Sequence, residues 1–178
     1  SELSPGDSIF FNRGDSFLGE LVVNGSGTES EPIVFTSYGS GDKPIISGKV
    51  GSSGGGDYQQ AIYILNHDNM VFENLEVQNN RQAPRTNVDN TDSFGIQIQN
   101  NSDEILNNFV FKNMTFRNVY AIAQVDPSDQ QAFNQFEVAA IRIFTDWNKA
   151  PINNVLVEDN YFTDLQRFGV HAKHAIGN

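Results

Sequence analysis

The segment NMVFENLEVQN, residues 69–79, decides the fold, because it recurs twice later in the chain. NFVFKNMTFRN occupies 108–118 and NVLVEDNYFTD occupies 154–164, and the three copies align without gaps. Each copy begins with Asn, and its sixth and eleventh residues are Asn or Asp. Apolar residues alternate with polar ones between these positions, which is the period of a β-strand. Each copy therefore predicts two short strands joined by a tight polar turn.

A second short pattern accompanies the repeat. It opens with a small residue and continues as a strand in AIYIL (61–65), GIQIQ (95–99), AIRIF (140–144) and GVHAK (169–173). No long stretch has the i, i+3, i+4 spacing of an amphipathic helix. Short strands, polar turns and coils of unequal length are typical of a parallel β-solenoid, whose coils stack about 4.8 Å apart. Asparagines in successive coils can then form hydrogen-bonded ladders, whereas a β-sandwich would not repeat this pattern in register.

The composition indicates one acidic domain. The 178 residues include 11 Lys and Arg against 22 Asp and Glu, a net charge of −11, and no Cys. This charge argues against nucleic acid and against an anionic membrane as partners. No apolar run approaches the ~20 residues of a transmembrane helix. Residues 169–178 open a coil without closing it, so we expect residues 1–178 to be N-terminal coils of a longer β-helix, associated with the remainder of its own chain.

The chain resembles the right-handed parallel β-helix proteins of the pectate-lyase-like superfamily. SPGDSIFFNRGDSFLGELVVNGSGTESEPIVFTSYGSGDKPIISG (4–48) is similar to the first coils of its polysaccharide-degrading members, especially alginate- and chondroitin-type lyases. The resemblance implies an all-β, right-handed parallel β-helix (β-solenoid), a secreted or periplasmic location, and an acidic, uronate-containing polysaccharide such as alginate as substrate. It also implies a groove along one outer sheet face, with Lys, Arg, Tyr or His for proton transfer and, in some members, Ca²⁺.

Strand alternation predicts which side chains line that groove. If the four strands of the second pattern form one sheet, their outward residues stack in columns. The first column contains Tyr63, Gln97, Arg142 and His171, and the second contains Leu65, Gln99, Phe144 and Lys173. We expect three catalytic residues: Arg142 to bind a substrate carboxylate, Lys173 to be the base, and His171 to be a second candidate for proton transfer. The substrate-binding residues expected on this face are Tyr63, Gln97, Gln99 and Phe144. Ordinary surface charges on a solvated sheet are the alternative interpretation.

Two long insertions, residues 80–94 and 119–139, precede strands of this sheet. Long loops on one edge of a rigid scaffold usually carry binding residues. Arg81 and Arg85 in the first insertion are predicted anion contacts, and His174 beyond the last strand is a predicted substrate contact. Plain solvated loops are the alternative for both insertions.

The second insertion also contains acidic residues. Asp126, Asp129 and Glu137 could ligate Ca²⁺ or form the wall of a sugar site. Their spacing matches no established metal motif, so we assign no metal ligand and leave Ca²⁺ as an open cofactor.

Three functions fit these observations. The first is a secreted lyase that cleaves an acidic polysaccharide by β-elimination, in which a cation stabilises the carboxylate while a base removes the neighbouring proton. The second is a glycoside hydrolase on the same fold acting on a neutral or sulfated glycan. It needs two carboxylates on the groove, and the two columns contain none. The third is a non-catalytic carbohydrate-binding or tail-fibre solenoid. We expect the lyase.

Overall fold

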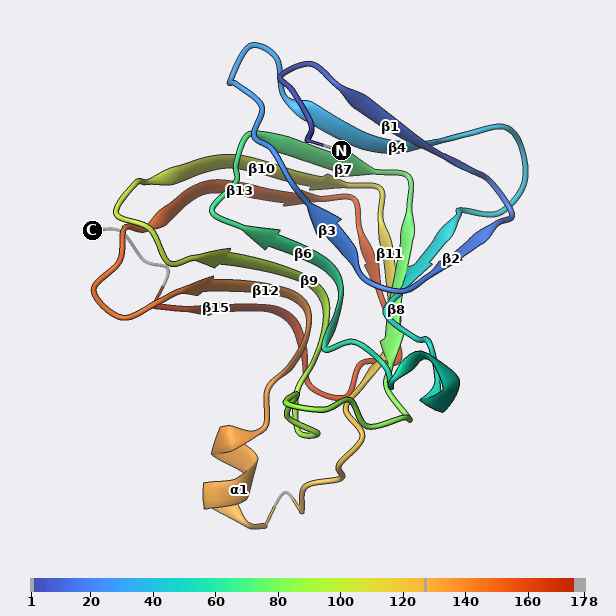
Figure 1. Ribbon diagram of the computed structural model, residues 1–178, viewed down its shortest axis with the longest axis vertical. Coiled ribbons are helices and arrows are strands. Elements are labelled where there is room, and N and C mark those ends of the chain that lie inside the picture. Colours follow the sequence, from blue (N-terminus) through green and yellow to red (C-terminus); the bar gives the residue numbers. More distant parts are fainter. Residues whose placement is uncertain (1, 127, 175–178) are drawn as a thin grey trace.

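The structure, a computed structural model, describes residues 2–126 and 128–174. Its strands form three parallel sheets that run along the stack of coils (Figure 1). The first sheet contains β1 (Ser8–Asn12), β4 (Ile33–Tyr38), β7 (Met70–Glu73), β10 (Leu106–Lys112) and β13 (Ile152–Glu158). The second contains β2 (Ser16–Leu18), β5 (Ile45–Ser47), β8 (Glu76–Asn80), β11 (Thr115–Tyr120) and β14 (Tyr161–Phe162). The third contains β3 (Leu21–Val23), β6 (Gln60–Leu65), β9 (Ser93–Asn100), β12 (Val138–Thr145) and β15 (Phe168–Lys173).

The predicted all-β, right-handed parallel β-helix is confirmed. Each coil contributes one strand to each sheet, and every pairing between coils is parallel. The three copies of the repeat are the strand pairs β7–β8, β10–β11 and β13–β14. The strands of the second pattern are β6, β9, β12 and β15, and they lie side by side in the third sheet.

Asparagine ladders close the turns before and within the repeat. Asn154 donates to the side-chain oxygen of Asn108 at 3.2 Å, and Asn108 donates to that of Asn69 at 2.8 Å. All three have a left-handed φ between 54° and 63°, which Asn tolerates better than most residues. A second ladder joins Asn113 to Asn74 at 2.7 Å.

The column expected from the eleventh repeat position does not form. Asn79 is buried and donates instead to the backbone oxygens of Tyr58 and Gln59, at 3.2 and 2.8 Å. The cause is a shift in the register between β8 and β11, which pairs Val119 rather than Asn118 with Asn79.

Phenylalanine and isoleucine fill the interior. The rings of Phe35, Phe72 and Phe111 stack in successive coils, with centroids 4.5 and 5.5 Å apart. Six isoleucines that alternation placed inward on the third sheet are buried: Ile62, Ile64, Ile96, Ile98, Ile141 and Ile143. Val170 has the equivalent inward position on β15, where strand alternation places it beside Ile141, but it is 43% exposed because β15 pairs only with β12 in the described part of the chain.

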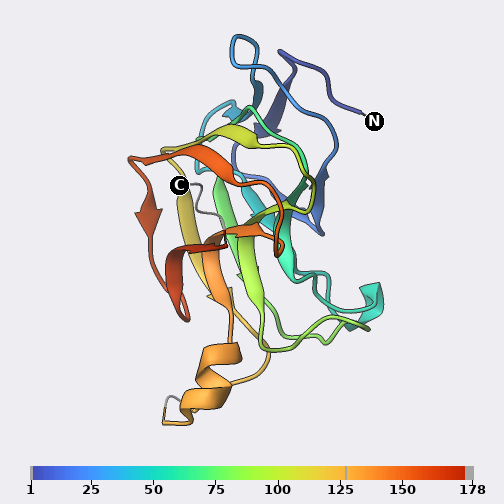
Figure 2. The ribbon, with the colours of Figure 1, turned by 90° about the vertical axis from the view of Figure 1, so that its left-hand side faces the viewer.

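The two predicted insertions both emerge between the second and third sheets, at the lower edge in Figure 1. They are shorter than expected, because β8 continues to Asn80, β9 begins at Ser93, β11 continues to Tyr120 and β12 begins at Val138. The second insertion contains a helix that the sequence did not predict, α1 (Gln130–Gln135), which projects beyond the coils (Figure 2). A short 3₁₀ helix, η1 (Ser52–Gly54), lies near the first insertion.

Arg167 connects α1 with the coils through hydrogen bonds and ring stacking. The Arg167 guanidinium donates to the backbone oxygens of Phe133, at 2.8 Å, and Phe136. It also stacks between the rings of Phe133 and Phe168, at 4.1 and 4.5 Å from their centroids. The helix is therefore held against the start of β15, beside the outer face of the third sheet.

Candidate functional site

The outer face of the third sheet has the register that the sequence predicts. Tyr63 pairs with Gln97, Gln97 with Arg142, and Arg142 with His171. The second column pairs Leu65, Gln99, Phe144 and Lys173 in the same order. We call this surface the groove face. It brings together all the predicted catalytic residues and the predicted sugar contacts Tyr63, Gln97, Gln99 and Phe144.

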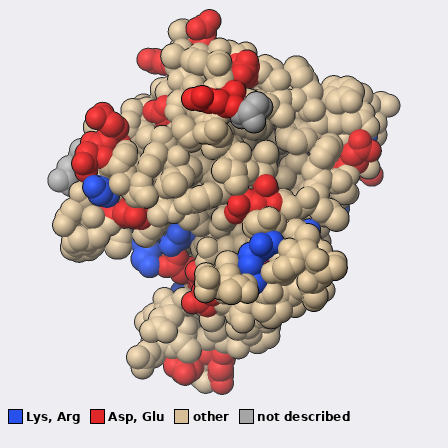
Figure 3. Space-filling view, in the orientation of Figure 1, with Lys and Arg blue, Asp and Glu red and all other residues tan. Residues whose placement is uncertain are grey.

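A carboxylate lies between the two predicted cations. Glu137, immediately before β12, accepts from Arg142 at 2.6 Å through one oxygen and from Lys173 through the other. The side chains of Glu137 and Arg142 are each 11% exposed, whereas that of Lys173 is 42% exposed. The Arg142 guanidinium also lies 4.2 Å from the Phe144 ring centroid. Figure 3 shows basic and acidic side chains together in the hollow between the sheet and the insertions.

This ion pair changes the roles open to the cations. Lys173 donates to Glu137, so its ammonium is not placed to accept a proton as the expected base. Arg142 already binds a carboxylate of the protein in the place where a substrate carboxylate was expected. The arrangement favours Arg142 and Lys173 as groups that keep Glu137 ionised.

A second carboxylate lies beside Glu137. Asp92, immediately before β9, accepts from the Gln59 side chain at 2.9 Å. Burial, followed by the negative charges of Asp89 and Glu137, raises the pKa of Asp92 to about 6, although Arg142 opposes this. Burial also acts to raise the pKa of Glu137, but Lys173 and Arg142 outweigh it and hold that pKa below its usual range. The neighbouring carboxylates therefore differ in protonation in mildly acidic solution up to about pH 6, where Asp92 keeps its proton while Glu137 is ionised.

Two further carboxylates border the groove face. Asp146, just after β12, accepts from Gln99 at 2.8 Å, and Gln99 accepts from the Tyr63 hydroxyl at 2.9 Å. Glu20, just before β3, accepts from the Gln60 side chain. Burial raises the pKa of Glu20, and it also raises that of Tyr63, with the charges of Glu20 and Asp146 adding to the effect on Tyr63.

Sequence reasoning missed three of these four carboxylates as groove residues, and it considered Glu137 only as a possible Ca²⁺ ligand or part of a sugar-site wall. Strand alternation assigns a direction only to residues within a strand, and all four lie just outside one: Glu20, Asp92, Glu137 and Asp146. Their shared position, within one residue of a strand of the third sheet, was the available signal. The two columns themselves contain no Asp or Glu, as the sequence indicates, but these four carboxylates lie beside them.

The two arginines of the first insertion have structural contacts. Arg81 was expected to contact an anion, but it is 1% exposed and its guanidinium donates to the backbone oxygens of Asp89, at 2.5 Å, and Asp92. Arg85 stacks over the Tyr58 ring at 3.6 Å and donates to Gly54 at 3.4 Å. Both arginines hold the insertion in place. The burial of Arg81 leaves it no exposed anion contact, whereas anion binding by the half-buried Arg85 stays a prediction.

The two histidines at the end of β15 contact aromatic rings. His171 stacks on Phe168 with 4.6 Å between centroids, and burial lowers its pKa, partly opposed by the charge of Glu137. His174 lies 5.9 Å from Phe144 and 5.4 Å from Trp147, centroid to centroid. Trp147, which sequence reasoning overlooked, is 75% exposed at the end of the groove face.

The acidic residues considered for Ca²⁺ do not form a site. Asp126 accepts from Ser128, Asp129 caps α1 by accepting from Ala132 at 3.0 Å, and Glu137 binds the two groove cations. Within residues 2–126 and 128–174, no group of three or more His, Cys, Asp or Glu is arranged to hold a metal ion. In the same residues, no helix has the length and apolar character needed to cross a bilayer.

The structure is thus a right-handed parallel β-helix with a polar and aromatic face on its third sheet. No protein-family model and no curated protein matches the chain. Its fold is similar to two crystal structures of GH136 lacto-N-biosidase from Eubacterium ramulus. The selenomethionine derivative is 18% identical, with a TM-score of 0.67, and the match covers 97% of this chain and 31% of that one. The native protein is 17% identical with a TM-score of 0.66 and the same coverage.

These similarities show the fold alone, and this chain spans about a third of the length of those structures. The structural neighbours carry the name of a glycoside hydrolase, whereas the sequence resemblance implied pectate-lyase-type enzymes.

Proposed function

We propose that the chain carries the groove of a glycoside hydrolase that acts on a neutral glycan. The observation that carries this proposal is that Glu137 and Asp92 precede paired residues of β12 and β9, and so lie at the start of neighbouring strands at the edge of the groove face. Arg142 contacts both Glu137 and the aromatic ring of Phe144. Glycoside hydrolysis needs two carboxyl groups, one protonated and one ionised. The name of the structural neighbours, lacto-N-biosidase, supports the same class of reaction.

The environments of the two carboxyl groups suggest their roles. Asp92, with its pKa raised to about 6, is the general acid that protonates the oxygen of the departing sugar. Glu137, kept ionised by Arg142 and Lys173, is the partner that activates water or attacks the anomeric carbon. The hydroxyl and amide groups of Tyr63, Gln97 and Gln99 can hydrogen-bond sugar hydroxyls along the same face.

The charge balance favours a neutral glycan over a uronate polymer. The cations of the groove face are Arg142 and Lys173, and both are paired with Glu137. The carboxylates of Glu20 and Asp146, which border the same surface, add negative charge. A polyuronate would meet like charges along this surface, which is unfavourable for encounter and binding. A lyase acting on alginate therefore has less support than a hydrolase, although both would use the same face. A secreted or periplasmic location remains a proposal, motivated by a glycan substrate outside the cell.

The test is hydrolysis of a panel of neutral oligosaccharides by the purified protein, followed by chromatography of the products. The panel includes glycans that end in lacto-N-biose. We expect Glu137→Gln and Asp92→Asn each to lower kcat/KM by about 10²–10⁴, the usual contribution of a positioned acid or base. Glu158→Gln is the matched control, because that carboxylate pairs with Lys112 on the first sheet, away from the groove face.

Two results would contradict the proposal. One is hydrolysis that survives both carboxylate substitutions at the rate of the Glu158→Gln control. The other is cleavage of alginate to products with the ultraviolet absorbance of an unsaturated uronate, which would restore the lyase. Thermal unfolding of each variant shows whether lost turnover reflects lost folding.

A further inference from the structure

We propose that Trp147, Asp146 and His174 form a subsite for one neutral sugar ring at the end of the groove face. The inference rests on the proposed function, because it extends the same glycan groove beyond the carboxylates. It specifies that the sugar bound at the end of the groove is uncharged.

The shape of this region suits a single ring. A hollow of about 250 Å³ is lined by Asp146, Trp147, Asn148, Lys149 and His174. This is smaller than the ~300–1,000 Å³ of pockets for drug-sized ligands. The Trp147 side chain is 75% exposed, so a ligand that covers the indole would remove a large apolar surface from water, which is favourable. The His174 ring stands nearly perpendicular to the indole, at 82°, and forms an adjoining wall.

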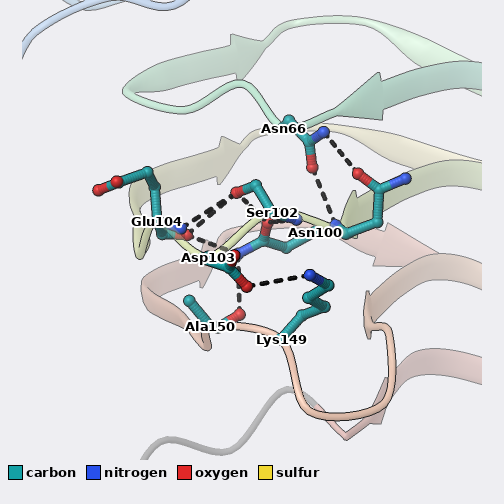
Figure 4. A network of polar contacts seen from close by, with 8 residues as sticks. Asn66, Asn100, Ser102, Asp103, Glu104, Lys149 and Ala150 are labelled. Atoms are coloured by element: carbon teal, nitrogen blue, oxygen red, sulfur yellow. Dashed lines mark hydrogen bonds and ion pairs between the residues drawn. The ribbon is translucent and has the colours of Figure 1, made fainter.

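The turn that carries Trp147 is fixed by polar contacts. Lys149 N–H donates to the oxygen of Asp146 at 3.1 Å, which closes the turn. The Asn100 side chain donates to the oxygens of Ala150 and Glu104, both at 2.8 Å, and so joins this turn to its neighbour in the preceding coil (Figure 4). A platform held in this way loses little conformational entropy when it binds a ligand.

The charges of the hollow favour a neutral sugar. Lys149 pairs with Asp103 at 3.0 Å, so its charge is already balanced (Figure 4). Asp146 receives one hydrogen bond from Gln99 and keeps further acceptor capacity for sugar hydroxyls. A uronate ring at this point would place its own carboxylate beside Asp146, and this like-charge contact is unfavourable.

A hydrogen-bonded path connects the hollow with the middle of the groove face. Asp146 accepts from Gln99 at 2.8 Å, and Gln99 accepts from Tyr63 at 2.9 Å and from Gln97 at 3.1 Å. These side chains come from three successive coils. A glycan bound across them would bring its terminal ring to Trp147.

The intrinsic fluorescence of the protein tests this subsite directly, because Trp147 is the single tryptophan of the chain. Lacto-N-biose and lactose are titrated into the Glu137→Gln protein, and an alginate disaccharide serves as the acidic probe. We expect a saturable change in emission with at least one neutral disaccharide and no change with the alginate disaccharide. In Asp146→Asn protein, the preference for the neutral probe over the acidic one should shrink.

Calorimetric titration of variants shows whether Trp147 itself contributes to binding of the neutral disaccharide. Trp147→Ala should weaken binding of the neutral disaccharide about tenfold, the effect of losing an aromatic anchor. Tyr161→Ala is the matched control, because Tyr161 is 64% exposed on the second sheet and should not affect binding. Equal binding by wild type and Trp147→Ala would overturn the subsite, as would an emission change that follows protein concentration alone, which would assign Trp147 to self-association.

The two proposals fail separately. A fluorescence response in a protein that hydrolyses no glycan would support the subsite and overturn the proposed hydrolase. Hydrolysis without any response at Trp147 would leave the hydrolase standing and overturn the subsite.

Discussion

Replacing Asp57 by Asn is expected to lower the free energy of unfolding by about 2.5 kcal/mol at neutral pH. The Asp57 side chain is fully buried, and its carboxylate accepts four backbone N–H groups: Val50 and Gly51 at 2.7 Å each, Gln82 at 2.7 Å and Ala83 at 2.9 Å. Burial acts to raise the pKa of Asp57, but the four hydrogen bonds outweigh it and lower the pKa from 3.8 to about 2. At about 1.4 kcal/mol per pKa unit, this lowering corresponds to about 2.5 kcal/mol.

The pH dependence has a definite sign. Because the pKa of Asp57 is lower in the folded state, its stabilisation is complete above pH 3.8 and is lost as the pH falls toward 2. Urea unfolding followed by circular dichroism should therefore show a gap between wild type and Asp57→Asn that narrows on acidification. Asp103→Asn is the control, because that side chain is 83% exposed. The reasoning would be refuted if the difference in unfolding free energy between wild type and Asp57→Asn stayed constant from neutral pH to below pH 3.8, or if there were no difference at any pH.

Three further predictions concern the coils and the site. Gly95→Ala should lower the free energy of unfolding by about 1–3 kcal/mol, because the added Cβ would lie 2.5 Å from the backbone oxygen of Ala140. Thermal unfolding should show a lower Tm for the variant, and an unchanged Tm would contradict this close contact between coils. Urea unfolding should give Asn108→Ala a free energy of unfolding about 1 kcal/mol below that of Asn108→Gly, because glycine adopts the φ of 63° without strain and alanine does not. Equal free energies would count against this turn geometry. The kcat/KM of the hydrolase should fall above about pH 6, as Asp92 loses its proton, and a profile flat through that region would exclude Asp92 as the acid.

The β-helix was predictable because its sequence period is explicit. The repeat that begins at Asn69, Asn108 and Asn154 places a left-handed asparagine at the same point of successive coils. The alternation in the second pattern fixes which residues face outward, so the pairing of Arg142 with His171 and of Phe144 with Lys173 followed from the sequence. The first inference uses the repeat of whole coils, and the second uses the side-chain period of a strand.

The rest of the site depends on segments that have no such period. The direction of Glu137, Asp92 and Asp146 is set by the ends of strands and by the packing of the insertions, and alternation does not describe either. The helix α1 has only six residues, no buried residue and one side-chain cap at Asp129, so it has no apolar stripe for sequence reasoning to detect. Arg81 is buried by the fold of its own insertion, which its charge gave no reason to expect.

The central claim is that the groove face hydrolyses a glycan, and the route of water tests it most directly. The protein is incubated in oxygen-18 water with either neutral oligosaccharides or alginate, and the masses of the products are measured by mass spectrometry. Hydrolysis adds one labelled oxygen to a fragment of a neutral glycan, and Glu137→Gln should abolish that addition. Unlabelled fragments of alginate that carry a double bond would contradict the account, because elimination breaks the bond without adding water.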